Sequence, residues 1–206
     1  MRIISNTAFG GERPLFESHD LRLENVIIHA GESAIKECSN IEAVNCRFEG
    51  NYPFWHVHGF VIDRCFFDVG GRSALWYSDH LKMTDTRIDA PKMFREMHDI
   101  EIENVEMNDA DEVFWRCQNL NIRNLKLHGG TYPFMFSSDI RIRRIGERQQ
   151  IRFPVCEECR VAQCQSHYKG CFLGGGECDN LRFRTQWRIS RLAFAQSPVG
   201  ELPYNR

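Results

Sequence analysis

Apolar and polar residues alternate in short stretches that return at a regular interval along the chain. In each stretch a second apolar residue follows the first by two positions and a third usually follows by five. Alternation with a period of two predicts β-strands, and no useful window keeps the 3.6-residue period of a helix. The first apolar positions of the seven copies are Leu21, Ile41, Phe60, Leu81, Ile100, Leu120 and Ile140.

A second patch, rich in aromatic residues, lies half a period from each strand, and Gly, Asn and Pro separate the patches. A unit of about 20 residues cannot bury its apolar face alone, whereas stacked copies can. The repeat therefore predicts an all-β fold, a parallel β-helix in which each repeat forms one coil, or rung. Residues 1–146 form about seven rungs in this prediction. The recurring asparagines are expected to stack as a side-chain ladder, formed by Asn25, Asn45, Asn104 and Asn124.

A quadrilateral β-helix of the pentapeptide type is the alternative architecture, because the repeat also divides into four groups of five. It requires a small or apolar inward residue at every fifth position around the coil. Gly130 and Asn51 fit this requirement poorly. The positions that do fit are Ala110, Trp115, Leu120 and Leu125.

The strand pattern stops near Gly146, and residues 147–206 form a tail without repeats that we expect to be irregular or disordered. This tail contains five of the nine cysteines. Thiolates and imidazoles at short spacings are typical of tetrahedral zinc sites, which makes four tail residues zinc candidates. They are Cys156, Cys159, Cys164 and His167.

A shift of reading frame explains the tail better than zinc does, and on this basis no metal site is assigned. Back-translation of residues 151–180 with suitable synonymous codons, read one base later, can give a sequence that includes KNVELHNAK and DAFWEAENV. These strings restore the strand and aromatic motifs of residues 111–126 and continue the repeat in phase. We therefore expect a frameshifted C-terminus, which the coding DNA would reveal.

Charge and hydropathy narrow the classes of function. Residues 1–146 carry 17 Lys and Arg against 22 Asp and Glu, a net charge of −5, and the remainder carries 9 against 6, a net charge of +3. An acidic body argues against nucleic-acid binding, which needs a basic stripe. No apolar run could span a membrane and the N-terminus lacks a signal-peptide pattern, which predicts a cytoplasmic protein without disulfides.

Several stretches of the repeat body resemble an uncharacterised bacterial family, domain-of-unknown-function family 3737. The resemblance covers residues 1 to about 145 and implies a right-handed parallel β-helix of the pectate-lyase type. The family supplies no activity, cofactor or catalytic residue to transfer. The stretches that carry the resemblance are Gly11–Phe16, Ala30–Glu37, Tyr52–Trp55, Leu75–Tyr77, Ile88–Arg95 and Val113–Trp115.

The aromatic patches are the first candidate site. On the outer face they would form a platform for sugar rings, whereas inside they would be core, worth about 1.5–3 kcal/mol per buried side chain. Because neighbours on a strand face opposite ways, one residue of Phe54–Trp55 and one of Phe114–Trp115 is expected to point outward. The candidate ligand-binding aromatic residues are Trp55, Trp76, Tyr77 and Trp115.

Two histidines beside the first tryptophan, His56 and His58, are the second candidate. Their alternate spacing places both on one strand face, where they could bind a metal or relay a proton, although solvated surface histidines are the simpler interpretation. Two ligands are too few for zinc. Asp79 and His80 are the nearest candidates for a third ligand, at no obvious rung offset.

Acidic and basic residues at turns are the third candidate. Stacked rungs could hold Asp63 and Asp85 as a pair for acid–base chemistry, although Asp is also a common turn former. Lys92 and Arg95, beside Pro91, could bind an anionic sugar, although a solvated turn is the simpler interpretation. The sequence favours a non-catalytic binding or scaffold protein that recognises carbohydrate, with no cofactor. The alternative is a polysaccharide lyase or glycoside hydrolase of the β-helix class.

Overall fold

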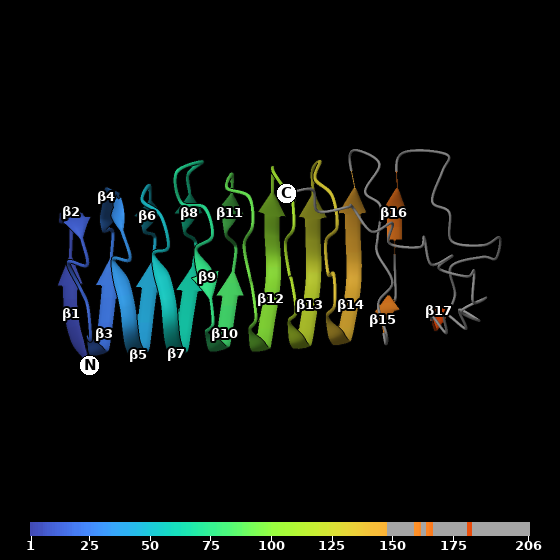
Figure 1. Ribbon diagram of the computed structural model, residues 1–206, viewed down its shortest axis with the longest axis horizontal. Helices are drawn as coiled ribbons and strands as arrows, with labels where there is room; N and C mark the ends of the chain where they lie inside the picture. The colour runs from blue at the N-terminus through green and yellow to red at the C-terminus, as the bar shows by residue number, and fades with distance from the viewer. Residues whose placement is uncertain (148–158, 162–163, 167–180, 183–206) are drawn as a thin grey trace, which may run out of the picture.

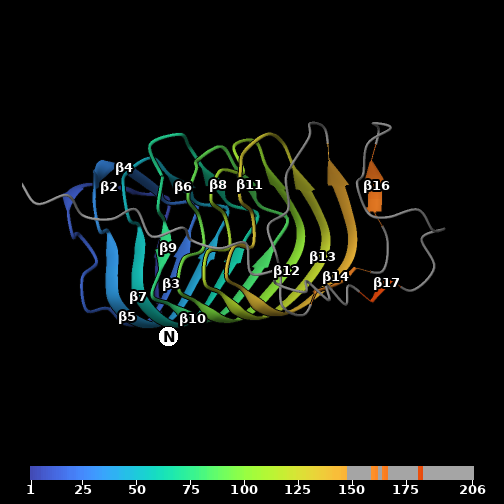
Figure 2. The same ribbon diagram turned by 45° about the vertical axis from the view of Figure 1, so that its right-hand side comes forward.

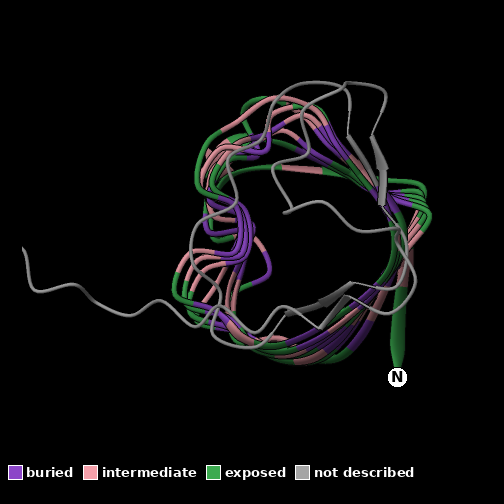
Figure 3. Cartoon of the chain, turned by 90° about the vertical axis from the view of Figure 1, so that its right-hand side faces the viewer, coloured by how far each residue is buried: buried purple, intermediate pink, exposed green. Residues whose placement is uncertain are grey.

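The computed structural model describes residues 1–147, 159–161, 164–166 and 181–182. Its strands stack in parallel along one axis, so that successive rungs lie side by side (Figure 1). Viewed along that axis, the rungs superpose on nearly the same outline (Figure 3). The predicted all-β parallel solenoid, with about seven rungs of about 20 residues, is confirmed.

Three rows of strands run along the solenoid, and the long strands belong to two rows at once, as Figure 2 shows for β12 to β14. The first row contains β1 (Arg2–Ser5), β3 (His19–Glu24), β10 (Asp79–Thr84) and β15 (Cys159–Val161). The second contains β2 (Ala8–Glu12), β4 (Ile27–Glu32), β6 (Arg47–Phe48), β8 (Phe66–Phe67), β11 (Arg87–Ile88) and β16 (Cys164–Ser166). The third contains β9 (Leu75–Trp76), which β5 (Ile35–Val44) and β7 (Phe54–Asp63) connect to the first row. The first two rows are joined by β12 (His98–Met107), β13 (Gln118–Leu127) and β14 (Ser138–Glu147).

The first apolar residue of each repeat points into one shared interior column. Leu81 pairs in register with Ile100, Ile100 with Leu120, and Leu120 with Ile140. These four side chains are at most 1% exposed. Stacking in register therefore buries, rung by rung, the apolar face that a single repeat could not bury alone.

The predicted asparagine ladder forms along one corner, in two segments. Each member has a positive φ, a conformation that Asn and Asp adopt more readily than other residues with side chains. The ladder is interrupted where Arg64 occupies the same corner position. The amide-to-oxygen distances are 2.6–3.0 Å along Asn6–Asn25–Asn45 and 2.8–2.9 Å along Asp85–Asn104–Asn124.

The structure does not follow the pentapeptide pattern. Ala110, Leu120 and Leu125 are buried, but Trp115 is only half-buried and lies on the outside, which breaks the required inward position at every fifth residue. Inward residues instead follow the two-residue alternation of strands, as with Ile100 and Ile102. The core is therefore that of a strand-walled solenoid.

Four cysteines within the rungs, Cys38, Cys46, Cys65 and Cys117, are buried free thiols. Burial raises the pKa of Cys38 to about 11 and that of Cys117 to about 12. Thiols held protonated in this way act as small apolar side chains rather than as nucleophiles.

Beyond Glu147, the described residues form three short strands. Although the sequence pattern stops near Gly146, β15 and β16 pair in parallel with β14 as the next rung would, and β17 (Leu181–Arg182) pairs antiparallel with β15. Cys159 and Cys164 belong to these strands, whereas Cys156, His167 and most of the expected irregular tail lie outside the described residues. In the described part of the chain, no helix is long and apolar enough to cross a membrane.

Candidate ligand-binding face

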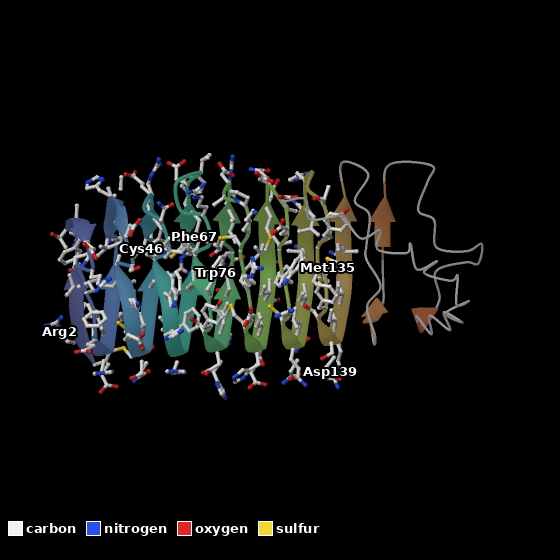
Figure 4. The ribbon with its side chains drawn as sticks, in the orientation of Figure 1. Arg2, Cys46, Phe67, Trp76, Met135 and Asp139 are labelled. Carbon is white, nitrogen blue, oxygen red and sulfur yellow. The ribbon has the colours of Figure 1, made fainter. Side chains whose placement is uncertain are left out.

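Stacking of the third row aligns five outward side chains, here called the aromatic–cation file: Lys36, Trp55, Trp76, Arg95 and Trp115. Register pairs connect each member to the next along the solenoid. All five side chains are half-buried, and Trp76 lies near the middle of the stack (Figure 4). Residues that are one repeat apart in the sequence thus become neighbours on one surface.

The alternation of inward and outward side chains places the tryptophans on this surface. Phe54 is fully buried while Trp55 faces outward, and Phe114 is fully buried while Trp115 faces outward. This confirms the predicted division of each aromatic pair between core and surface. The aromatic patches therefore contribute both to the core and to the outer surface, with one residue of each pair in each place.

Each cation of the file lies over a tryptophan ring. The Arg95 guanidinium carbon is 5.0 Å from the ring centroid of Trp76 and 5.2 Å from that of Trp115, and Lys36 Nζ is 5.4 Å from that of Trp55. These distances are within the range of cation–π attraction. Within residues 1–147 neither Lys36 nor Arg95 forms a salt bridge.

Further aromatic residues widen the face around its centre. Tyr52 packs edge-on against Trp55 at 4.9 Å, and Tyr77 lies 5.9 Å from the same ring while 38% exposed. The indole nitrogen of Trp76 donates a hydrogen bond to the carbonyl of Lys92 at 3.1 Å, which fixes the orientation of its ring. The result is a continuous aromatic surface over neighbouring rungs.

The remaining predicted basic residue is already paired. Lys92 Nζ lies 3.4 Å from a carboxylate oxygen of Glu112, so its charge is partly compensated, unlike that of Arg95. Lys92 and Arg95, which were expected to bind an anionic sugar together, therefore differ in whether a carboxylate already pairs with them. Arg95 is the better candidate.

The predicted catalytic carboxylates lie on another part of the coil, Asp63 at the end of β7 and Asp85 directly after β10. Asp63 accepts a hydrogen bond from the Thr84 hydroxyl at 2.6 Å and pairs with Arg64 at 2.5 Å. Asp85 is a member of the corner ladder and accepts from the amide of Asn104. Both carboxylates thus have structural partners within the solenoid.

The predicted histidine pair is divided between two groups of residues. His56 and His58 flank the buried Val57, but His56 contacts Glu37 and Tyr77, whereas His58 Nδ1 lies 2.7 Å from Asp79. A histidine of the next rung completes this second group, and the sequence pattern did not predict it.

That residue is His98, which pairs in register with Asp79 on the following rung. The repeat interval could have identified it, had that interval been applied to the corner. Hydrogen bonds from His80 and His58 hold the pKa of Asp79 below its ordinary value, although partial burial opposes this shift. The hydrogen bond to Asp79 raises the pKa of His80.

Comparison with known proteins identifies one family. The family model described as protein of unknown function (DUF3737) matches residues 2–186, which is further along the chain than the resemblance expected from the sequence. No curated protein and no solved structure matches the chain.

Proposed function

The chain belongs to the DUF3737 family, and since that family has no assigned function, we propose from the chain's own surface that it binds an anionic carbohydrate. The binding surface is the aromatic–cation file, and the role is recognition without catalysis. The observation that supports this most is Arg95, which is held between two tryptophan rings on an outward face and has no salt-bridge partner among the described residues.

The chemistry of such a face suits an acidic sugar. The C–H face of a pyranose ring buries apolar area when it packs against an aromatic ring, while its hydroxyls remain in water. A guanidinium offers a planar pair of donors that match the two oxygens of a carboxylate. Rungs about 4.8 Å apart repeat these contacts along one direction, as an extended chain of uronic acids would require.

The positions of the carboxylates support binding rather than cleavage. General acid–base cleavage of a sugar chain needs two carboxyl groups that converge on the bound ligand. Asp63 and Asp85 instead have structural partners away from the aromatic–cation file. A lyase or hydrolase is the competing proposal, and it predicts that the bound polymer is shortened.

Titration calorimetry with an oligogalacturonate, and with a neutral oligosaccharide of equal length, tests this proposal. We expect the full chain to bind the anionic oligomer and to leave it uncleaved. Because a charge-assisted hydrogen bond contributes about 1.5–3 kcal/mol, Arg95→Gln is expected to weaken binding by roughly 10- to 150-fold. Trp76→Ala should also weaken binding, through loss of the stacking surface.

Matched controls exist on other faces of the same solenoid. Arg123 is exposed and pairs with Glu103 at 3.7 Å, so Arg123→Gln should bind as the parent does. Phe66 lies between Arg47 and Arg87 in a similar cation–aromatic arrangement on the second row, which makes Phe66→Ala the aromatic control. Equal affinity for the neutral oligomer, no binding at all, or equal losses in the control variants would overturn the proposal.

A further inference from the structure

A second group of side chains with coordinating atoms lies at the corner where the strands of the first row begin. Asp79 pairs in register with His58 on one side and His98 on the other. His80 and Asp99 follow directly at the neighbouring corner position, each with a positive φ. The stacking therefore gathers three imidazoles and two carboxylates from three rungs. Asp139, at the lower edge in Figure 4, belongs to the same corner further along the solenoid.

The atoms of this group are close enough to share one ion. His80 Nδ1 lies 2.8 Å from one oxygen of Asp79, and His98 Nε2 lies 3.6 Å from the other. One ligand atom each from Asp79, His80 and His98 can be chosen so that all three lie within 4.8 Å of one another. In a tetrahedral zinc site with bonds of 2.0–2.1 Å, neighbouring ligand atoms are about 3.4 Å apart.

We propose that Asp79, His80 and His98 bind one divalent transition-metal ion, with zinc as the reference case. Two imidazoles and a carboxylate favour zinc and its neighbours over magnesium and calcium, which prefer oxygen ligands alone. Three protein ligands on an exposed corner leave the fourth position to water or to a small ligand. This proposal is independent of carbohydrate binding.

The surroundings of His98 fit a metal ligand. Its Nδ1 lies 3.0 Å from Asp99, so a proton held there leaves Nε2, the nitrogen facing Asp79, free to coordinate. Metal-bound histidines commonly donate their second ring proton to a carboxylate in this way, which orients the ring. Asp99 is therefore a positioning residue. His58 approaches Asp79 at 2.7 Å and orients that carboxylate from the opposite rung.

Charge at the corner also favours a dication. Elsewhere on the surface, carboxylates pair with arginine, as Asp89 does with Arg87 and Glu42 with Arg22. Among the described residues, Asp79 and Asp99 have no Lys or Arg partner; Asp79 pairs with histidines, and Asp99 pairs with histidines and accepts a hydrogen bond from Asn119. The two carboxylates therefore place negative charge at this corner without a Lys or Arg to balance it, and one divalent cation would do so.

Calorimetric titration of the full chain with Zn²⁺ at neutral pH tests this site. We expect one ion per chain to be bound at this corner, and the double variant His80→Gln/His98→Gln to weaken that binding at least 100-fold. Asp99→Asn should weaken it by 10- to 100-fold, the usual effect of losing a carboxylate that orients a ligand. Circular dichroism of each variant confirms that the fold is retained.

Two controls separate this site from other zinc binding. His29 is an exposed histidine with a single carboxylate partner, Glu49 at 3.0 Å, so His29→Gln should bind zinc as the parent does. The variant Cys156→Ser/Cys159→Ser should also retain the site, since its ligands contain no thiolate. Co²⁺ bound at the corner should accordingly lack the thiolate charge-transfer absorption. Unchanged zinc binding in the double histidine variant, or no zinc binding by the parent, would overturn the proposal.

Discussion

The stacked phenylalanines in the core provide the sharpest test of the packing. Phe114 is fully buried, and its ring is nearly parallel to those of Phe94, at a centroid distance of 4.5 Å, and Phe134, at 4.7 Å. The three residues come from successive rungs. Substitution of Phe114 with Ala therefore removes the central ring of the stack and leaves a cavity between two rungs.

The expected cost is large because the Phe114 side chain is fully buried. Replacement of a buried Phe by Ala typically lowers the free energy of unfolding by about 3–5 kcal/mol. Each aromatic contact that is lost contributes about 0.5–1.5 kcal/mol within that range. Phe114 has a positive φ, but Ala retains the Cβ, so the substitution does not relieve the backbone.

Urea denaturation followed by circular dichroism measures the effect, and hydrogen exchange localises it to the adjoining rungs. The matched control is Phe136→Ala: this residue also has a positive φ but is 61% exposed, so it should change stability by about 0.5 kcal/mol or less. A Phe114→Ala protein as stable as Phe136→Ala would refute the stacked core.

Two further predictions concern the close approach of neighbouring rungs at a glycine and the dependence of thermal stability on pH. A Cβ added at Gly31 would lie 2.0 Å from the backbone oxygen of Gly11 on the preceding rung, so Gly31→Ala should lower the urea midpoint, whereas Gly10→Ala should be tolerated. The hydrogen bond with His128 holds the pKa of Glu106 below its ordinary value. The stability that this interaction contributes is therefore fully present above the ordinary pKa of Glu. It is lost as the pH falls through the depressed pKa of Glu106. Glu106→Gln should melt below the parent at pH 6, and the difference should close in acid.

Each of these two predictions would be contradicted by a specific result. Equal urea midpoints for the two glycine variants would mean that the rungs approach less closely at Gly31 than the structure indicates. A melting-temperature difference between Glu106→Gln and the parent that persists at pH 3 would mean that the ionised carboxylate is not the source of the stabilisation.

Much of the fold could be predicted because stacking requires the same positions to point inward at every rung. The position that Leu81 occupies must point inward, and so must the equivalent position of Ile100 in the next rung. The sequence therefore repeats the apolar residue of this column in successive rungs. The corner ladder was predictable for the same reason, since Asn tolerates the positive φ of the turn and pairs with Asn on the next rung.

The remainder depends on register and on local backbone conformation. Loops of unequal length make the spacing between register partners differ slightly from rung to rung, so the alignment of Arg95 between its two tryptophans follows only from the register in the structure. Phe94 and Phe114 adopt positive φ, which is rare for bulky residues, so strand alternation alone does not place them. Side-chain pairing between rungs follows only once the register is fixed.

The register between rungs is also the premise of both proposed sites, because a slip of one residue would turn the aromatic–cation file inward. Disulfide trapping tests it most directly. Glu101 and Asn121 are register partners on the outer face of β12 and β13, with Cα atoms about 4.8 Å apart, within the range a disulfide allows. In the control pair, Glu101 with Arg123, the separation is about 8 Å, which is too long.

Peptide mass spectrometry after mild oxidation gives the result. We expect Glu101→Cys/Asn121→Cys to form a disulfide between these two positions in the folded protein, and Glu101→Cys/Arg123→Cys to stay reduced at its two positions. A disulfide in the second pair and not in the first would contradict the register on which the binding face and the metal site depend.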